Sequence, residues 1–422
     1  MLSSSLVVIP LLAAAFTAQP AAAYPPAASD PVYIALVNNE ETLATKKRDL
    51  VDLEDRATVR CAATTDCSKA AYAIPPNSHY ACNKARATCT WSCNSGYTST
   101  GTACARSATT TPASPAGPKA PAATPILKRT YAGATFFDQF NFWSKPDPTH
   151  GQVNYLTREA ATRKGLVSVS KAGTAVLQID RSSKLALGAK RDSVRIESKE
   201  VYQPGNLIIL DMKHAPWGPS VWPAFWLYNY PWPQSGEVDI YEGVNSRTFN
   251  QATLHTVPGC TRSGAQTGNS AASSPNCDAY GPTWGCSSFD YDQSSYGDGF
   301  NRAGGGVFAV LFAETGISMW RFPRARIPAD IKSGAPRWKS WGTPFAAFDG
   351  STCDTRTYFK NQMLTFDITT CGDWAGQDGV WRDSSLSGLV YPRYANCAAA
   401  VADPAAMKEA YFEINYLKVF SV

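Results

Sequence analysis

Short apolar segments separated by polar turns dominate the chain from about residue 130 to its end. Residues 411–420 alternate almost strictly between apolar and polar positions, which is the pattern of a strand with one buried face. Helical periodicity is scarce, and residues 404–411 suggest no more than a helical turn or two. Many short strands without intervening helices predict an all-β sandwich or barrel. Other strand-like segments are 165–169, 175–179, 194–198, 207–212, 238–241, 306–311 and 317–321.

An apolar run near the N-terminus indicates the expected compartment. Residues 6–16 are apolar, and Ala21, Ala22 and Ala23 follow them. This arrangement is typical of a secretory signal peptide cleaved after Ala23, and the run is shorter than the ~20 residues that span a bilayer. We expect residues 1–23 to be removed and the protein to be secreted, either extracellular or associated with the cell wall, with no membrane partner.

The next segments differ from one another in composition. Residues 24–48 are polar and end in a basic tripeptide, so they are either a propeptide or a solvated charged segment. Residues 49–104 are rich in cysteine, and residues 105–129 consist mainly of Pro, Ala, Thr and Ser, which favours an extended linker. The large all-β domain is then expected over residues 130–422.

The 12 cysteines form two groups of six. The first group predicts a small module, residues 49–104, held by three disulfides whose pairing has 15 possibilities. Because the module has no Cys-x-x-Cys pair, a zinc site is disfavoured. Tyr80, Trp91 and Tyr97 form either a sugar-binding face or, as the favoured interpretation, the module's minimal core. The second group is expected to form three disulfides that hold long loops: Cys260, Cys277, Cys286, Cys353, Cys371 and Cys397.

Charge and motifs exclude several functional classes. The net charge is +5 over 422 residues, and no Lys/Arg-rich run follows the pattern of a phosphate-binding surface, so nucleic acid is not an expected partner. The sequence also lacks a Gly-x-Ser-x-Gly nucleophile elbow, a His-Glu-x-x-His zinc helix and a phosphate-binding glycine loop.

The candidate chemistry lies in a strand-like segment with three acidic residues, Glu237, Asp239 and Glu242. Side chains alternate along a strand, so Glu237 and Asp239 share one face and Glu242 would fall on the other. A β-bulge, which inserts one extra residue, would return Glu242 to the face of the other two. Two such carboxylates fit a retaining glycosidase. The alternatives are an exposed acidic edge strand or a row of calcium ligands.

Tryptophans close to the acids favour a carbohydrate substrate. Trp222, Trp226 and Trp232 precede Glu237, and indole rings pack well on the C–H faces of sugars. For Trp226, a buried core position is an open alternative. His255 follows on the segment that would form a neighbouring strand, where it could hydrogen-bond Asp239 or a sugar hydroxyl.

These features together resemble glycoside hydrolase family 16, and in particular its secreted fungal endo-1,3(4)-β-glucanases, or laminarinases. The resemblance covers most of residues 131–422. It rests on the bulged Glu-x-Asp-x-x-Glu pattern and on the following segments: 136–138, 147–149, 193–198, 222–227, 254–256, 366–368 and 371–376.

The resemblance implies a concanavalin-like β-jelly-roll with its substrate in a concave cleft. It implies that Glu237 is the nucleophile, Glu242 the general acid/base and Asp239 an assisting residue, with His255 beside them. The tryptophans would line the substrate-binding cleft. No cofactor is implied; some members bind a structural calcium ion, whose ligands we do not assign here.

The predicted function is retaining hydrolysis of internal bonds in β-1,3-glucan or mixed-linked β-1,3/1,4-glucan by a monomer. Two alternatives remain: a cell-wall glucan transglycosylase, if an acceptor sugar replaces water, or a non-catalytic wall protein that binds β-glucan. The loop of residues 258–296 and the cysteine-rich module lie outside the shared motifs, and both leave the exact substrate preference open.

Overall fold

The computed structural model describes residues 78–83, 88–95, 97–99, 104–106, 125–264, 270–383, 388 and 390–422. The predicted signal peptide, the segment 24–48 and most of the predicted linker lie outside these residues. Of the cysteine-rich module, β1 (Ser78–Asn83) pairs with β2 (Thr88–Cys93), and β3 (Tyr97–Ser99) pairs with β4 (Cys104–Arg106). A disulfide joins Cys93 to Cys104. The side chains of Tyr80 and Trp91 are outside the description.

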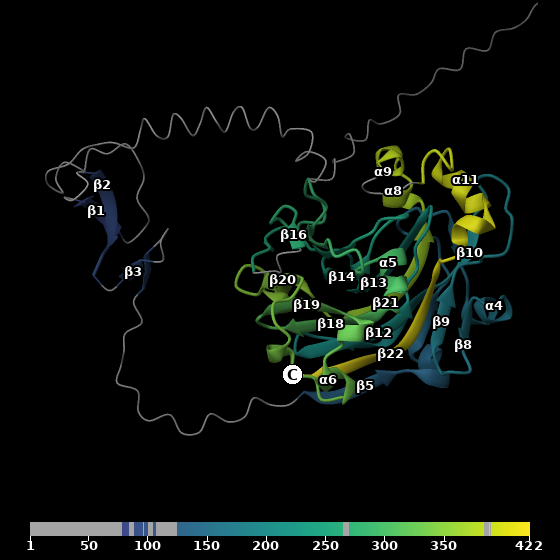
Figure 1. The fold of residues 1–422 in the computed structure, drawn as a ribbon, viewed down its shortest axis with the longest axis horizontal. Helices are drawn as coiled ribbons and strands as arrows, with labels where there is room; N and C mark the ends of the chain where they lie inside the picture. Colours follow the sequence, from purple (N-terminus) through teal and green to yellow (C-terminus); the bar gives the residue numbers. More distant parts are fainter. Residues whose placement is uncertain are drawn as a thin grey trace, which may run out of the picture.

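The large domain consists of two eight-stranded sheets (Figure 1), as predicted for a sandwich rather than a barrel. The first sheet has the order β16-β17-β15-β14-β13-β21-β11-β6, and the second has the order β20-β19-β18-β12-β22-β9-β8 with β5 beside β22. The strands of the first sheet are β6 (Phe140–Trp143), β11 (Arg195–Tyr202), β13 (Val221–Tyr228), β14 (Glu237–Glu242), β15 (Asn250–His255), β16 (Ser270–Ala272), β17 (Cys286–Asp290) and β21 (Gln362–Thr370). Those of the second are β5 (Ile126–Tyr131), β8 (Val167–Val169), β9 (Ala175–Gln178), β12 (Asn206–His214), β18 (Gly306–Ala313), β19 (Gly316–Pro323), β20 (Ala346–Asp349) and β22 (Tyr411–Ser421).

Short helices and one small ladder complete the domain. Strands β7 (Val153–Tyr155) and β10 (Arg191–Ser193) form a parallel pair. The α-helices are α4 (Arg158–Arg163), α5 (Gly297–Arg302), α6 (Ala329–Lys332), α7 (Thr355–Tyr358), α8 (Gly372–Ala375), α9 (Asp378–Arg382) and α11 (Cys397–Ala402). The 3-10 helices are η1 (Gly133–Gln139), η2 (Arg324–Arg326), η3 (Trp338–Ser340) and η4 (Pro404–Met407). The predicted helical turn at 404–411 is therefore present as η4.

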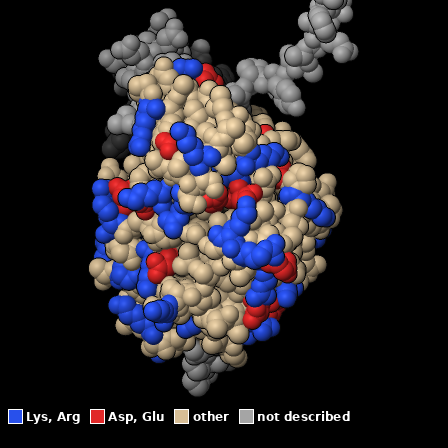
Figure 2. Space-filling view, turned by 90° about the vertical axis from the view of Figure 1, so that its right-hand side faces the viewer, with Lys and Arg blue, Asp and Glu red and all other residues tan. Residues whose placement is uncertain are grey.

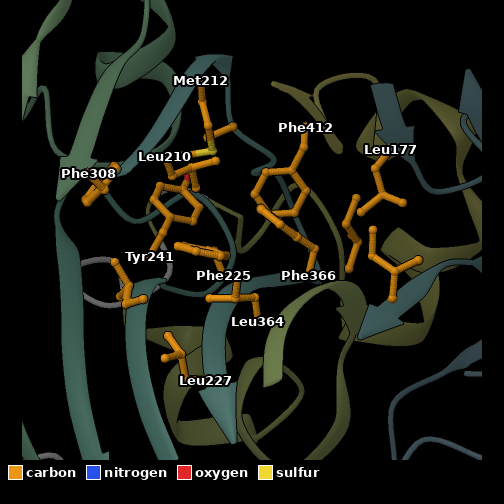
Figure 3. Close-up of a cluster of buried hydrophobic side chains, with 14 of the residues drawn as sticks. Leu177, Leu210, Met212, Phe225, Leu227, Tyr241, Phe308, Leu364, Phe366 and Phe412 are labelled. Carbon is orange, nitrogen blue, oxygen red and sulfur yellow. The ribbon is translucent and has the colours of Figure 1, made fainter. Parts of the chain in front are cut away.

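A core of apolar side chains fills the space between the sheets (Figure 3). Phe225 of β13 stacks on Phe366 of β21 with ring centroids 4.5 Å apart, and Phe366 also contacts Phe412 of β22 in the opposite sheet. Fully burying one such ring stabilises the fold by roughly 1.5–3 kcal/mol. Phe225 and Leu227 point into this core, so the alternation of β13 turns Trp226 to the opposite face of the sheet. The core interpretation of Trp226 is therefore wrong.

The disulfides of the large domain agree with the sequence prediction, whereas the start of the domain differs from it. The second group of cysteines forms three disulfides, as predicted, pairing Cys260 with Cys353, Cys277 with Cys286, and Cys371 with Cys397. The domain begins earlier than the expected boundary at residue 130, because β5 starts at Ile126 and pairs with β22.

Charged side chains are mixed on the face that carries α4, β8 and α11. Figure 2 shows blue basic groups on this face with red acidic groups among them. Lys164 pairs with Asp192, and Arg158 pairs with Asp138. In the described part of the chain, no helix has the length and apolar character needed to cross a membrane.

Candidate active site

A β-bulge in β14 brings the three acids to one face of the first sheet. In the pairing with β15, Asp239 lies opposite Thr253 and Glu242 lies opposite Gln251, so three steps along β14 match two along β15. Ile240 and Tyr241 lie between these two pairs and accommodate the extra residue of the bulge. Both side chains are fully buried in the core. The bulge expected from the spacing is present, and Glu242 returns to the face of Asp239.

Two indoles hold the outer acids of this row. Trp232 Nε1 donates a hydrogen bond to Glu237 Oε2 at 2.5 Å, and Trp222 Nε1 donates to Glu242 Oε1 at 2.9 Å. Each bond fixes one carboxylate oxygen and leaves the other oxygen of that acid for further contacts. Two of the predicted tryptophans therefore contact the acids directly.

His255 is brought to the same place by β15. Its Nε2 atom lies 3.1 Å from Asp239 Oδ2, at ion-pair distance although not in hydrogen-bond geometry, and 3.7 Å from Glu237 Oε1. The ring faces the two acids at the start of β14, and Glu237 is directly opposite His255 in the strand register. His255 therefore lies beside Asp239, and its role there stays a prediction.

Burial changes the protonation of all three acids. Loss of hydration, followed by the negative charge of Asp239, raises the pKa of Glu237 to about 8 and that of Glu242 to about 8. Burial also holds the pKa of Asp239 well above its usual range. The positive charge of His255 and the indole N–H groups act in the opposite direction on the two glutamates. The site therefore retains protons near neutral pH that exposed carboxylates would lose.

A second polar group on the same sheet was not assigned from the sequence. Trp226 Nε1 donates to Asp367 Oδ1 at 2.7 Å, so this tryptophan contacts an acid of β21 rather than the acids of β14. Arg195 of β11 packs over the Trp226 ring at 4.9 Å and lies 3.1 Å from Glu197 Oε1. Tyr228 donates to the same Glu197 oxygen at 2.5 Å. The only sequence signal for Asp367, Arg195 and Glu197 was their position in segments that carried the family resemblance, and Tyr228 directly follows one of these segments.

Three side chains of β14 and β15 could also hold a cation. Glu237, Asp239 and His255 each offer a ligand atom, and the three atoms lie within 4.8 Å of one another. An ion bound there would occupy the predicted nucleophile, so we assign no metal to this group. The calcium ion of some family members stays a prediction without assigned ligands.

Comparisons with known proteins identify the family to which the sequence is similar. A family model described as "XgeA-like, catalytic GH16 domain" matches residues 140–420. A probable endo-1,3(4)-β-glucanase of Aspergillus fumigatus is 41% identical over 296 residues, which are 70% of this chain and 45% of the relative. The chain thus spans less than half the length of that relative. An endo-1,3(4)-β-glucanase of Arthroderma benhamiae is 40% identical over 71% of this chain and 65% of its own length.

Two solved structures are similar in fold and sequence. Laminarinase 16A from Phanerochaete chrysosporium, solved with β-glucans in donor and acceptor sites, is 36% identical with a TM-score of 0.65. An elongating family 16 β-1,3-glucosyltransferase is 39% identical with a TM-score of 0.63. Each match covers 71% of this chain and all of the solved chain.

Proposed function

Because this chain belongs to glycoside hydrolase family 16, we propose that it is a secreted, retaining endo-β-glucanase. Its substrate would be β-1,3-glucan or mixed-linked β-1,3/1,4-glucan, cleaved at internal bonds. The observation that carries the proposal is the bulged strand β14, which presents Glu237 and Glu242 on one face with Asp239 between them and an indole N–H on each glutamate.

In the first step of the proposed mechanism, one bond forms and one breaks. Glu237 attacks in its ionised form, which the charge of His255 and the hydrogen bond from Trp232 favour, and it attacks the anomeric carbon through Oε1 because Trp232 holds Oε2. Glu242 gives its proton to the glycosidic oxygen through Oε2, because Trp222 holds Oε1. The sugar on the leaving side departs as an alcohol, and the other sugar stays on Glu237 as an ester.

In the second step, water replaces the enzyme on the sugar. Glu242, now ionised, removes a proton from water, and the resulting oxygen attacks the anomeric carbon while the bond to Glu237 breaks. Two displacements at one carbon retain its configuration. The raised pKa of Glu242 suits it to hold a proton before the first step. Asp239 and His255 assist through their charges: the negative charge of Asp239 raises the pKa of Glu237, and the positive charge of His255 lowers it.

Transglycosylation is the second candidate function. It differs in the acceptor alone, since a sugar hydroxyl would take the place of water in the second step. The similarity to the elongating β-1,3-glucosyltransferase favours keeping this candidate. A non-catalytic glucan-binding role is less favoured, because such a protein has no need of three acids on one face.

Product analysis tests the proposal. Incubation with β-1,3-glucan, mixed-linked glucan and β-1,3-galactan should give short oligosaccharides from either glucan at the earliest times, with the β-anomer formed first in the proton NMR spectrum. If the oligosaccharides released first are later converted to longer products, transfer would be favoured over hydrolysis. Binding without any product, or initial formation of the α-anomer, would contradict retaining hydrolysis.

Secretion is tested by the N-terminus of the mature protein. Protein recovered from the culture medium should begin at Tyr24 if only the signal peptide is removed, or at Asp49 if residues 24–48 are a propeptide. Retention of residues 1–23 in a cell-bound protein would contradict this part of the proposal.

A further inference from the structure

A disulfide-bridged loop lies directly against the catalytic strands. The bond between Cys277 and Cys286 closes residues 277–286, which include no described helix or strand before β17 begins at Cys286. At Gly285 the loop approaches β15 so closely that a Cβ atom would lie 2.5 Å from Leu254 O and 2.9 Å from His255 Nδ1. The glycine allows this approach, and the loop is fixed at the rim of the active site.

The loop carries two large aromatic side chains in the solvent. Tyr280 is 74% exposed and Trp284 is 60% exposed. Trp284 has a φ of +51°, in the left-handed region that bulky residues rarely adopt. Exposing both rings forgoes the stabilisation that their burial would give, and strained backbone of this kind is frequent at ligand-binding positions.

Hydrogen bonds within the loop hold both aromatic residues in place. The amide groups of Gly281 and Gly285 each donate to Asp278 O at 3.0 Å, and Tyr280 N donates to Asp278 Oδ1 at 3.0 Å. Trp284 N donates to Gly281 O at 3.0 Å. Together with the disulfide, these bonds reduce the entropy that the loop would lose on binding a ligand.

One of the exposed rings, that of Tyr280, continues the aromatic lining of the active site. The Tyr280 ring meets the Trp232 ring edge to face, with centroids 5.9 Å apart and an interplanar angle of 81°. Trp232 in turn holds Glu237. A continuous path of contacts therefore leads from the predicted nucleophile, through Trp232, to the outer surface of the loop.

We propose that Tyr280 and Trp284 form an additional binding platform for glucosyl units of the same β-glucan chain, beyond those at the catalytic acids. This inference rests on the proposed function and specifies it further, because the platform would make the enzyme prefer long chains over short ones. The one acidic residue of the loop, Asp278, is half-buried and accepts from Tyr280 N, whereas the two most exposed rings, Tyr280 and Trp284, are aromatic and uncharged. Such a surface suits the C–H faces of a neutral sugar chain that leaves the cleft.

The test compares long and short substrates in matched variants. Tyr280→Ala and Trp284→Ala should each raise KM for long β-1,3-glucan by roughly threefold to tenfold, the range expected from the loss of one aromatic contact. Both should leave kcat/KM unchanged on a short aryl oligoglucoside. Tyr280→Phe and Trp284→Phe keep the rings and should behave as the unmodified enzyme. Trp338→Ala, on the outer face of the second sheet, is the control for loss of an aromatic ring elsewhere.

Each outcome separates this inference from the proposed function. If the unmodified enzyme cleaves none of the glucans, the proposed function fails. If it cleaves them and the alanine variants show the same KM on long chains, or lose activity equally on short and long chains, the platform is contradicted. The affinity of Glu237→Gln for laminari-oligosaccharides of increasing length gives a second measurement, and it should rise with length less steeply once Tyr280→Ala is added.

Discussion

The outer faces of the two sheets use similar residues for different purposes. On the second sheet, an aromatic and aliphatic cluster that includes Trp320 is covered by the chain's own residues Ile327 and Ile331 and is packed against Trp338 and Trp341. On the first sheet, Trp222 and Trp226 of β13, with Trp232 of the β13–β14 connection, remain accessible in part and donate to carboxylates. A tryptophan on the outer face is therefore structural where another segment covers it and available for ligands where acids share its surface.

The acids of the two faces differ in the same way. Asp211 on the second sheet is paired with Arg324 at 2.7 Å and accepts from Asn415. On the first sheet, Glu237 and Asp239 both lie near the imidazole of His255, and the Glu242 carboxylate accepts from the neutral indole of Trp222. An acid with its own cation stabilises the fold, whereas a row of acids with few cations has raised pKa values that suit proton transfer. This contrast predicts that substitutions on the first sheet change activity and those on the second change stability.

The largest expected effect is that of Glu237→Gln. The amide has the shape of the acid but cannot attack the anomeric carbon, so kcat on β-1,3-glucan should fall by about a thousandfold or more. The midpoint temperature of thermal unfolding should be unchanged or slightly higher, because a buried acid whose ionisation burial disfavours is replaced by a neutral amide of the same shape. Activity above a few per cent in the purified variant would remove Glu237 from the nucleophile role.

On the second sheet, Trp320→Ala should lower stability without changing the chemistry. Trp320 is 6% exposed, and its truncation leaves a cavity that costs about 3–5 kcal/mol in the free energy of unfolding. The measurement is denaturant unfolding together with kcat at a temperature where the variant is folded. A large fall in kcat of the folded variant would break the distinction between the two faces.

Asp239→Asn should shift the pH profile. The negative charge of Asp239 raises the pKa of Glu242, so its removal lowers that pKa, and Glu242 loses its catalytic proton at lower pH. The alkaline limb of kcat/KM should therefore move to lower pH, with kcat reduced roughly tenfold to a hundredfold. An unchanged alkaline limb would show that Asp239 does not act on Glu242 through its charge.

The smallest effect is expected for Trp232→Phe, which keeps the ring and removes the N–H group. The hydrogen bond from Trp232 lowers the pKa of Glu237, so its loss raises that pKa. The acid limb of kcat/KM should move to higher pH, and the rate should fall about threefold to tenfold. A shift in the opposite direction would contradict the role of this indole.

Local sequence patterns predicted the parts of the site that lie on one strand. The spacing of Glu237, Asp239 and Glu242 breaks strict alternation, and this break predicted the bulge in β14. His255 was predicted from its distance along the chain, because it follows Glu242 by about the length needed to return on the neighbouring strand. Alternation along residues 411–420 likewise predicted β22.

Residues from distant strands could not be placed in the same way. Asp367 and Arg195 approach Trp226 because β21 lies between β13 and β11, an order that depends on how the whole sheet assembles. The pairing of Cys277 with Cys286, which positions Tyr280, is also one of several pairings that the sequence allows. These contacts are set by packing between distant segments rather than by local pattern.

Trapping of the intermediate tests the central claim most directly. A 2-deoxy-2-fluoro laminaribiosyl fluoride slows both steps of a retaining mechanism, with a larger effect on the release of the sugar, so the ester on the nucleophile accumulates. Peptide mass spectrometry of the inactivated enzyme should place the added sugar on Glu237. A label on Glu242, or complete turnover with inverted product and no labelled peptide, would contradict the proposed roles of the acids on β14.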